Sequence, residues 1–206
     1  AGTACSYPKS KQLKINPPPF KEEDVYPAEP ESAYGWSKLM GEYELDLASK
    51  LNKIEAGVIR LHNVYGPPCE ISKEKSQVIP SLIRKLLLNE EFIVWGSGEQ
   101  RRAFLYIDDV IDGIYKYMNR GFGSGCIQLS PTESTSISDI ANKLVKISKK
   151  NVEIKFDTSK PEGDKDRTGN INKAFQILEW SPNITIDDGL EKTYHWVKKN
   201  LSNEKA

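Results

Sequence analysis

Residues 33–66 read AYGWSKLMGEYELDLASKLNKIEAGVIRLHNVYG. In the first half of this segment an apolar side chain recurs every four residues, at Leu39, Tyr43, Leu47 and Leu51. This spacing places the apolar side chains along one face of a helix. Ser32 is a suitable N-cap, so we predict a helix over 33–51 and a short strand over 57–61. A helix followed directly by a short apolar strand is typical of a parallel α/β sheet.

The same rules predict further elements along the chain. We expect helices over 78–88, 108–118, 138–149, 172–178 and 187–200. We expect short strands near 1–5 and over 92–95, 103–107, 126–129 and 152–156. Helices and strands therefore alternate along the chain, which favours an α/β fold.

Composition limits the classes of protein to consider. The chain has 206 residues, of which 38% are hydrophobic and 28% charged, as in globular proteins. Lys and Arg number 29 and so do Asp and Glu, so no overall basic field favours nucleic acid or an anionic membrane. The three cysteines and two histidines are widely spaced, which predicts neither a disulfide framework nor a metal site. A reducing, cytoplasmic setting is the default expectation.

Tyr34 and Lys38 are the first candidates for chemistry. They are four residues apart at the start of the predicted helix, so both side chains lie on one face. A nearby ammonium favours the phenolate form of a tyrosine and makes it a better base. A hydroxyl such as Thr3 could bind the substrate oxygen whose proton Tyr34 takes, while hydride passes to a nicotinamide. Taken alone, the pair is more typical of a solvated helix face, because the pattern is common.

Four motifs in order resemble the extended short-chain dehydrogenase/reductase family of nucleotide-sugar epimerases and dehydratases. They are Thr3, the Tyr34–Lys38 pair, Asn-Val-Tyr-Gly-Pro at 63–67 and Arg-Ala-Phe-Leu-Tyr-Ile-Asp-Asp at 102–109. The resemblance implies the C-terminal half of a Rossmann-like, doubly wound parallel sheet plus a small α/β substrate-binding lobe. The sheet would contain strands near 1–5, 58–62 and 103–107.

The resemblance also implies a division of the chain. Residues 1–66 would be the remnant of an NAD(P)-binding domain. Residues 67–206 would mainly form the substrate lobe, with about 100–120 returning to the first domain. The glycine-rich turn that binds the dinucleotide in this family is absent from the chain. We therefore expect the isolated chain to be a fragment that binds dinucleotide weakly and has no turnover.

Within the family, the chain most resembles the GDP-mannose 3,5-epimerases. The residues that carry this likeness are 4–8, 11–13, 27–30, 62–63 and 95–98. The likeness implies that Cys5 and Lys75 exchange protons at the sugar, with NAD as cofactor. Transient oxidation at C4 would make the protons on C3 and C5 acidic, because both carbons flank the new ketone. Thr3, Tyr34 and Lys38 would catalyse the oxidation, and Tyr34 and Lys38 would also contact the cofactor.

The likeness further assigns four residues to the nucleotide-sugar. Asn63 would bind the sugar or its pyrophosphate, Arg102 and Arg167 the phosphates or the nucleotide, and Tyr194 another part of the ligand. Two of them have a plainer reading from their neighbours in the sequence. Arg167 lies in a charged run that is typical of solvated surface, and Tyr194 in a helix where core packing is common. Cys5 equally suits a small buried residue at a strand end, and Lys75 a solvated loop.

Several alternatives stay open. A dehydratase of this family would carry Asp-Glu where Ala4-Cys5 stand, which argues against dehydration. A UDP-hexose 4-epimerase needs no second acid/base pair and is the main alternative. A non-catalytic nucleotide-sugar-binding protein of the same fold is the other. The residue that would distinguish NAD from NADP is absent, and by resemblance the full-length parent would be a homodimer.

Overall fold

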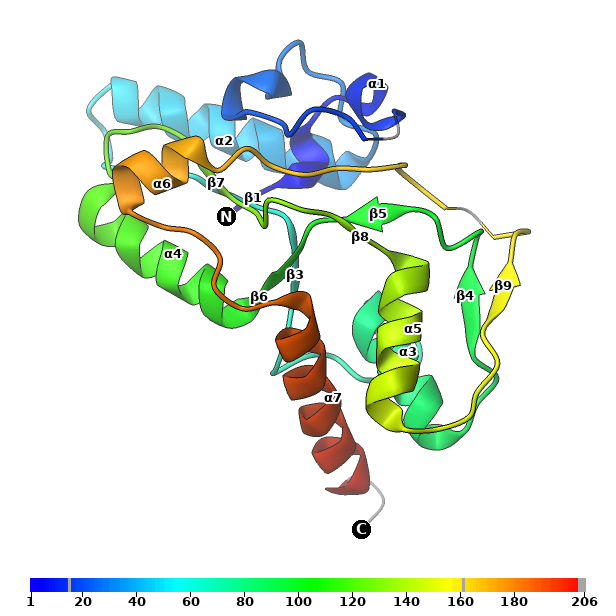
Figure 1. Ribbon diagram of the computed structural model, residues 1–206. Coiled ribbons are helices and arrows are strands. Elements are labelled where there is room, and N and C mark those ends of the chain that lie inside the picture. Colours follow the sequence, from blue (N-terminus) through cyan, green and yellow to red (C-terminus); the bar gives the residue numbers. More distant parts are fainter. Residues whose placement is uncertain (15, 161, 204–206) are drawn as a thin grey trace.

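A three-stranded parallel sheet forms one half of the protein. The computed structural model describes residues 1–14, 16–160 and 162–203. The strands run in the order β1-β2-β7, where β1 is Gly2–Thr3, β2 is Ile59–Leu61 and β7 is Ile127–Leu129. Each of these strands has only two or three residues, yet they bring distant segments of the chain to one sheet edge (Figure 1).

Helices cover both faces of this sheet. The helix α2 (Ala33–Lys50) packs on β1 at one face. On the other face, α4 (Ile107–Arg120) and α6 (Asn172–Leu178) enclose an apolar cluster with Ile127 and Leu129 of β7. Successive side chains of a strand point to opposite faces of the sheet, so both faces carry side chains that a helix can cover.

A buried ion pair fixes α2 on the sheet. Arg60 of β2 donates to Glu42 of α2, with Nη2 and Oε2 2.6 Å apart, and the Arg60 side chain is 3% exposed. Arg60 also donates to the Glu22 carbonyl and to the Tyr7 hydroxyl, so each nitrogen of its guanidinium has a hydrogen-bond partner. A buried charge with these partners ties the position of α2 to the register of β2.

The central strand changes partners halfway along its length. Its first part, β2, pairs with β7, and its continuation β3 (Asn63–Tyr65) pairs in parallel with β6 (Phe104–Tyr106). At the junction, the His62 amide donates to the Leu129 carbonyl, and the next amide, that of Asn63, donates to the Ala103 carbonyl. One extended segment thus belongs to both halves of the protein.

This pairing corrects one expectation. The sequence analysis placed 103–107 in the same sheet as 1–5 and 58–62, which is wrong: β7 is the third strand of that sheet, and β6 pairs with β3 in a separate two-stranded sheet. Apolar runs identify the strands, but they do not show which strand pairs with which. That pairing depends on the point at which the strand over 59–65 leaves one sheet and joins the other. The proposed boundary at residue 66 stays a prediction.

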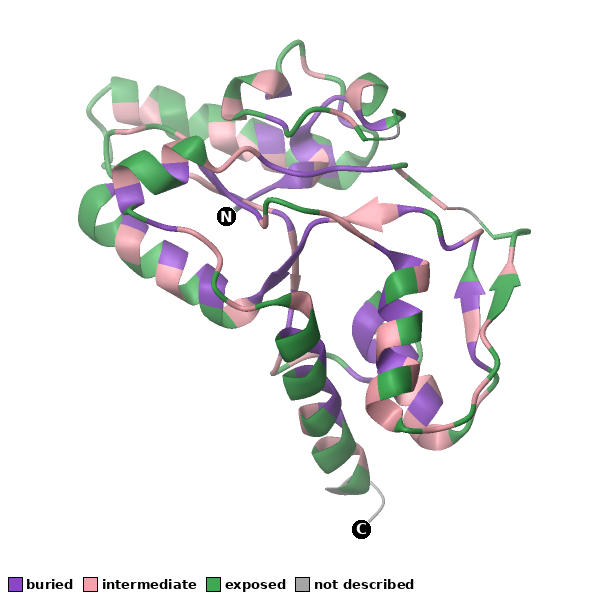
Figure 2. Cartoon of the chain, in the orientation of Figure 1, coloured by how far each residue is buried: buried purple, intermediate pink, exposed green. Residues whose placement is uncertain are grey.

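Three helices build the second half around the largest apolar cluster. They are α3 (Val78–Leu88), α5 (Ile137–Ser148) and α7 (Ile186–Asn203). Two small sheets border them: β4 (Ile93–Trp95) with β9 (Lys155–Asp157) in parallel, and β5 (Arg101–Arg102) with β8 (Thr135–Ser136) antiparallel. Figure 2 shows the buried side of α3 and α5 turned toward each other.

The predicted elements are mostly confirmed, with two local corrections. The Ser32 hydroxyl accepts from the Gly35 amide at 3.1 Å and caps α2 as expected. The strand expected over 1–5 ends at Thr3, because the Thr3 hydroxyl accepts from the Cys5 amide and starts the 3-10 turn η1 (Ala4–Ser6). The strand expected over 152–156 begins only at Lys155, where pairing with β4 starts.

Two further short helices lie in the N-terminal loop, α1 (Lys9–Gln12) and η2 (Glu22–Val25). None of the helices in the described residues has both the length and the apolar character that crossing a membrane requires. Across those same residues, His, Cys, Asp and Glu side chains form no group of three or more that could hold a metal ion.

Candidate active site

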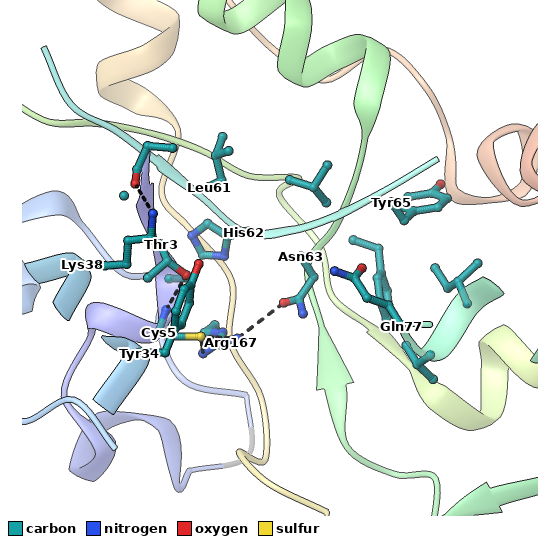
Figure 3. Close-up of a pocket in the computed structure, with 17 residues that line it drawn as sticks. Thr3, Cys5, Tyr34, Lys38, Leu61, His62, Asn63, Tyr65, Gln77 and Arg167 are labelled. Carbon is teal, nitrogen blue, oxygen red and sulfur yellow. Dashed lines mark hydrogen bonds between the residues drawn. The ribbon is translucent and has the colours of Figure 1, made fainter. Parts of the chain in front are cut away.

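A cavity of about 520 Å³ lies at the carboxyl ends of β1 and β2. Residues that follow parallel strands meet at one sheet edge, which is where α/β proteins bind ligands. Here Thr3 ends β1 and Cys5 lies in the turn after it, while His62 and Asn63 follow β2 (Figure 3). The remaining wall is formed by Ala1, Gly2, Ala4, Tyr34, Lys38, Leu61, Val64, Tyr65, Gln77, Val78, Ile79, Phe104 and Arg167.

Tyr34 and Lys38 enter the cavity from the first turns of α2. The Lys38 ammonium lies 5.9 Å from the centre of the Tyr34 ring and donates to the Ala1 carbonyl at 3.3 Å. The Tyr34 side chain is 54% exposed, so a ligand can reach it. The structure thus brings the pair to the same cavity as Thr3, whereas the sequence motif fixes only the four-residue spacing from Tyr34 to Lys38.

Gly35 lets the start of α2 approach the turn that carries Cys5. A Cβ atom added at Gly35 would lie 2.3 Å from the Cys5 carbonyl oxygen and 2.9 Å from Cβ of Pro30. No side chain fits in this space. The glycine inside the Tyr-x-x-x-Lys motif therefore sets the distance between Tyr34 and Cys5.

Cys5 lies against a buried arginine. Both terminal nitrogens of Arg167 are 4.0 Å from the Cys5 Sγ. Arg167 also donates to Gln12 Oε1 at 2.8 Å, to Asp164 Oδ2 at 3.1 Å and to Asn63 Oδ1 at 3.5 Å. Arg167 is 5% exposed, so this residue of the charged run 164–167 is not on a solvated surface. Figure 3 places its guanidinium between Cys5 and Asn63.

His62 is a cavity residue to which the sequence analysis gave no role. Gln128 donates through Nε2 to the Phe20 and Asn170 carbonyls, so its Oε1 accepts from the Tyr7 hydroxyl and from His62 Nε2, 3.1 Å away. The proton of the neutral imidazole is therefore on Nε2. Burial, with Arg167 nearby, lowers the pKa of His62 to about 3. The sequence feature that could have identified His62 is its position directly after the strand predicted over 57–61.

Arg102 faces a second cavity of about 700 Å³. This cavity shares Asn63, Val78 and Phe104 with the first, so the two are adjoining. Arg102 donates to the Asp164 carbonyl at 2.7 Å, while Arg167 binds the Asp164 carboxylate. Burial and the charge of Arg167 lower the pKa of Arg102. The two predicted phosphate-binding arginines therefore flank Asp164 and reach different cavities.

Two predicted site residues lie elsewhere. Lys75 is exposed in the turn before α3 and lines neither of these cavities. Tyr194 is 5% exposed in the large apolar cluster with Leu190 and Val197, and burial raises its pKa. The structure thus supports core packing for Tyr194 and brings neither residue to the site.

The Tyr-x-x-x-Lys helix and the Thr3 hydroxyl thus meet at the carboxyl edge of a parallel sheet, as expected from the resemblance to the short-chain dehydrogenase/reductase family. The chain belongs to the NAD dependent epimerase/dehydratase family, whose sequence model matches residues 1–125.

Relatives of the chain include proteins named as nucleotide-sugar enzymes. The chain is 32% identical to GDP-mannose 3,5-epimerase of Arabidopsis thaliana over 210 residues, covering 100% of the chain and 54% of that protein. It is 28% identical to GDP-L-fucose synthase 1 of the same plant, covering 98% of the chain and 63% of that protein. The chain thus spans about half the length of the 3,5-epimerases it matches.

Solved structures agree with the fold. UDP-glucuronic acid 4-epimerase from Bacillus cereus, in complex with UDP-glucuronic acid and NAD, superposes with a TM-score of 0.79 at 29% identity, over 94% of this chain and 60% of that one. UDP-glucose 4-epimerase from Thermotoga maritima gives a TM-score of 0.85 at 22% identity, over 95% and 62%. The α/β fold expected from the sequence is confirmed.

Proposed function

We propose that this chain carries the sugar-processing half of a nucleotide-sugar epimerase, with chemistry like that of GDP-mannose 3,5-epimerase. One observation supports this most: Cys5 lines the same cavity as Thr3, Tyr34 and Lys38. A thiol at this place can exchange a proton with carbon, whereas a 4-epimerase requires only the oxidation and reduction step.

The residues present suit the nicotinamide end of NAD. Tyr34 and Lys38 are both open to the cavity, and the Lys38 ammonium is held by only one backbone carbonyl. When bound, NAD would supply the oxidising power by accepting a hydride and returning it. Tyr34 would take the proton of the C4 hydroxyl, and Thr3 would hold the same oxygen through a hydrogen bond. The Lys38 charge would favour the phenolate of Tyr34.

The oxidised sugar makes the next step possible for Cys5. A ketone at C4 acidifies the protons on the neighbouring carbons, so Cys5 can remove and return one of them. Asn63, next to Arg167 and at the boundary of the two cavities, would hold the sugar or its pyrophosphate. Arg102 in the second cavity would bind the phosphates, because a guanidinium matches their oxygens.

A second candidate is a UDP-hexose 4-epimerase. It is favoured by the position of Lys75, which is exposed and outside both cavities. Without a second acid/base group on the opposite face of the sugar, Cys5 could remove and return protons on one face only. The role of Lys75 as the partner of Cys5 stays a prediction that requires movement of the turn before α3.

Incubation with GDP-mannose in deuterated water tests the proposal. The complete gene product should place deuterium at C3 and C5 of the sugar, detected by NMR. Cys5→Ala should lower that exchange by about 10²–10⁴-fold, while Cys69→Ala, away from the cavity, should leave it unchanged. Inversion at C4 of UDP-glucose without deuterium at C3 or C5 would instead identify the second candidate. Binding of both sugar nucleotides with neither exchange nor inversion would contradict both candidates.

A further inference from the structure

The two terminal nitrogens of Arg167 have unequal partners. Nη1 donates to Gln12 Oε1 at 2.8 Å and to Asp164 Oδ2 at 3.1 Å. Among the described residues, the contacts of Nη2 are longer than usual hydrogen bonds, 3.5 Å to Asn63 Oδ1 and 4.0 Å to Cys5 Sγ. Nη2 is therefore the nitrogen that can donate to a ligand in the cavity that Arg167 lines.

Asp164 does not fix the guanidinium relative to the cavity by itself. It lies three residues before Arg167 in the same segment of chain, so the two residues move together. Asp166, between them, is also buried, but its Oδ1 has no hydrogen-bond partner among the described residues. The direction of Arg167 must therefore be set by a residue from another part of the chain.

Gln12, at the end of the short helix α1, supplies this contact from 155 residues away in the sequence. Its side chain is 1% exposed, and its Nε2 donates to the Tyr7 carbonyl at 2.8 Å and to the Pro8 carbonyl at 3.4 Å. Carbonyl oxygens can only accept, so Oε1 is the atom that faces Arg167. The Gln12 carbonyl also accepts from the Lys165 amide at 3.2 Å, so one residue holds both the backbone of this segment and its arginine.

We propose that Gln12 is a positioning residue that holds Nη1 of Arg167, so that Nη2 is directed at a pyrophosphate oxygen of the nucleotide-sugar. The identity of the ligand rests on the proposed function. A guanidinium binds phosphate oxygens through its terminal N–H groups, and one that is already held loses less side-chain freedom on binding. Gln12 lines neither of the two cavities, so its effect on the ligand must pass through Arg167.

A double-mutant cycle tests the inference by calorimetry on the complete gene product, with GDP-mannose or with UDP-glucose if that binds more tightly. Gln12→Leu, which is similar in size but cannot accept a hydrogen bond, should weaken binding about tenfold. Arg167→Gln should weaken it at least as much. Adding Gln12→Leu to Arg167→Gln should then weaken binding by less than about twofold, because Gln12 acts through Arg167.

Three controls separate this role from a general loss of structure. Gln12→Glu keeps an acceptor oxygen at the same place along the side chain and should retain most of the affinity. Ser10→Ala, in the same helix, removes a hydrogen bond to Glu29 at 2.5 Å and should leave the affinity unchanged. Gln12→Leu should bind NAD as tightly as the wild type, because Tyr34 and Lys38 keep their positions.

An equal loss from Gln12→Leu in both backgrounds would overturn the role of Gln12, since damage to the fold adds to the loss of Arg167. A loss in Gln12→Glu as large as that in Gln12→Leu would also overturn it. If the coupling is found but the C3 and C5 exchange is not, the proposed function fails while the role of Gln12 stands. If the wild type binds neither nucleotide-sugar, both fail.

Discussion

His62 illustrates how one buried residue joins the site to the sheet. Its Nε2–H donates to Gln128, whose amide is held by two backbone carbonyls, and its Nδ1 is buried without a partner. Gly169 packs so closely that an added Cβ would lie 2.7 Å from His62 Nε2. No acceptor for a second proton lies at Nδ1 among the residues that the structure describes, and burial with Arg167 nearby favours the neutral imidazole.

This environment predicts a pH dependence of stability. The folded-state pKa of His62, about 3, lies below the value of about 6.5 for an unfolded histidine. The unfolded chain therefore binds a proton that the folded chain does not, and stability present above about pH 6.5 is lost as pH falls below it. Between about pH 7.5 and about pH 5.5, the free energy of unfolding should fall by about 1.4 kcal/mol from this residue.

Urea unfolding at the two pH values measures this loss. His62→Gln should remove most of that pH dependence, even if the variant is less stable at both values. His195→Gln changes an exposed histidine that pairs only with Glu191 at 3.8 Å, so it should keep the wild-type slope. A His62→Gln slope equal to that of the wild type would show that His62 is not kept neutral.

The helix α2 has a different environment at each of its two glycines. Gly35 touches the Cys5 carbonyl and the Pro30 ring, whereas no atom would lie within 4 Å of a Cβ added at Gly41. Both residues are helical, so the intrinsic cost of glycine in a helix is the same at each. Only tertiary packing distinguishes them.

The matched substitutions Gly35→Ala and Gly41→Ala should therefore act in opposite directions. Gly41→Ala should stabilise the chain by about 0.5–1 kcal/mol through helix propensity. Gly35→Ala must push the Cys5 turn away from α2 and should destabilise by about 1–3 kcal/mol. Denaturant unfolding gives both values. If Gly35→Ala were as stable as Gly41→Ala, the close approach of α2 to the Cys5 turn would be wrong.

At the scale of the whole molecule, two apolar clusters share one residue. Ile107, at the start of α4, packs against the cluster of α3, α5 and α7 and also against the cluster of α4, α6 and β7. The strand over 59–65 connects the same two halves through its change of partner at His62. The site lies at this junction, so its geometry depends on the two halves being held together.

Ile107→Ala should weaken both halves at once. Hydrogen exchange should increase in α5 and in α6, with a loss of about 2 kcal/mol in the free energy of unfolding. Leu144→Ala is the control, since Leu144 belongs to the larger cluster alone and should affect α3, α5 and α7 more than α6. Faster exchange in only one half of Ile107→Ala would contradict the coupling.

Local patterns were sufficient for most of the elements and for part of the site. Apolar spacing predicted α2, α3 and α6, and Ser32 predicted the cap, because these depend on side chains a few residues apart. The resemblance carried by Thr3, Tyr34, Lys38 and Cys5 identified residues that do line one cavity. The same reasoning could not place Lys75 or Tyr194, whose surroundings come from other segments.

The sequence by itself determined the α/β class, the helix that carries Tyr34 and Lys38, and the family. The tertiary structure alone decided which strand pairs with which and that Arg167 contacts Cys5 across 162 residues of chain. It also decided that His62 is held neutral. The physical reason is range: helix periodicity and capping act over a few residues, whereas sheet partners, burial and charge contacts arise only when distant segments pack together.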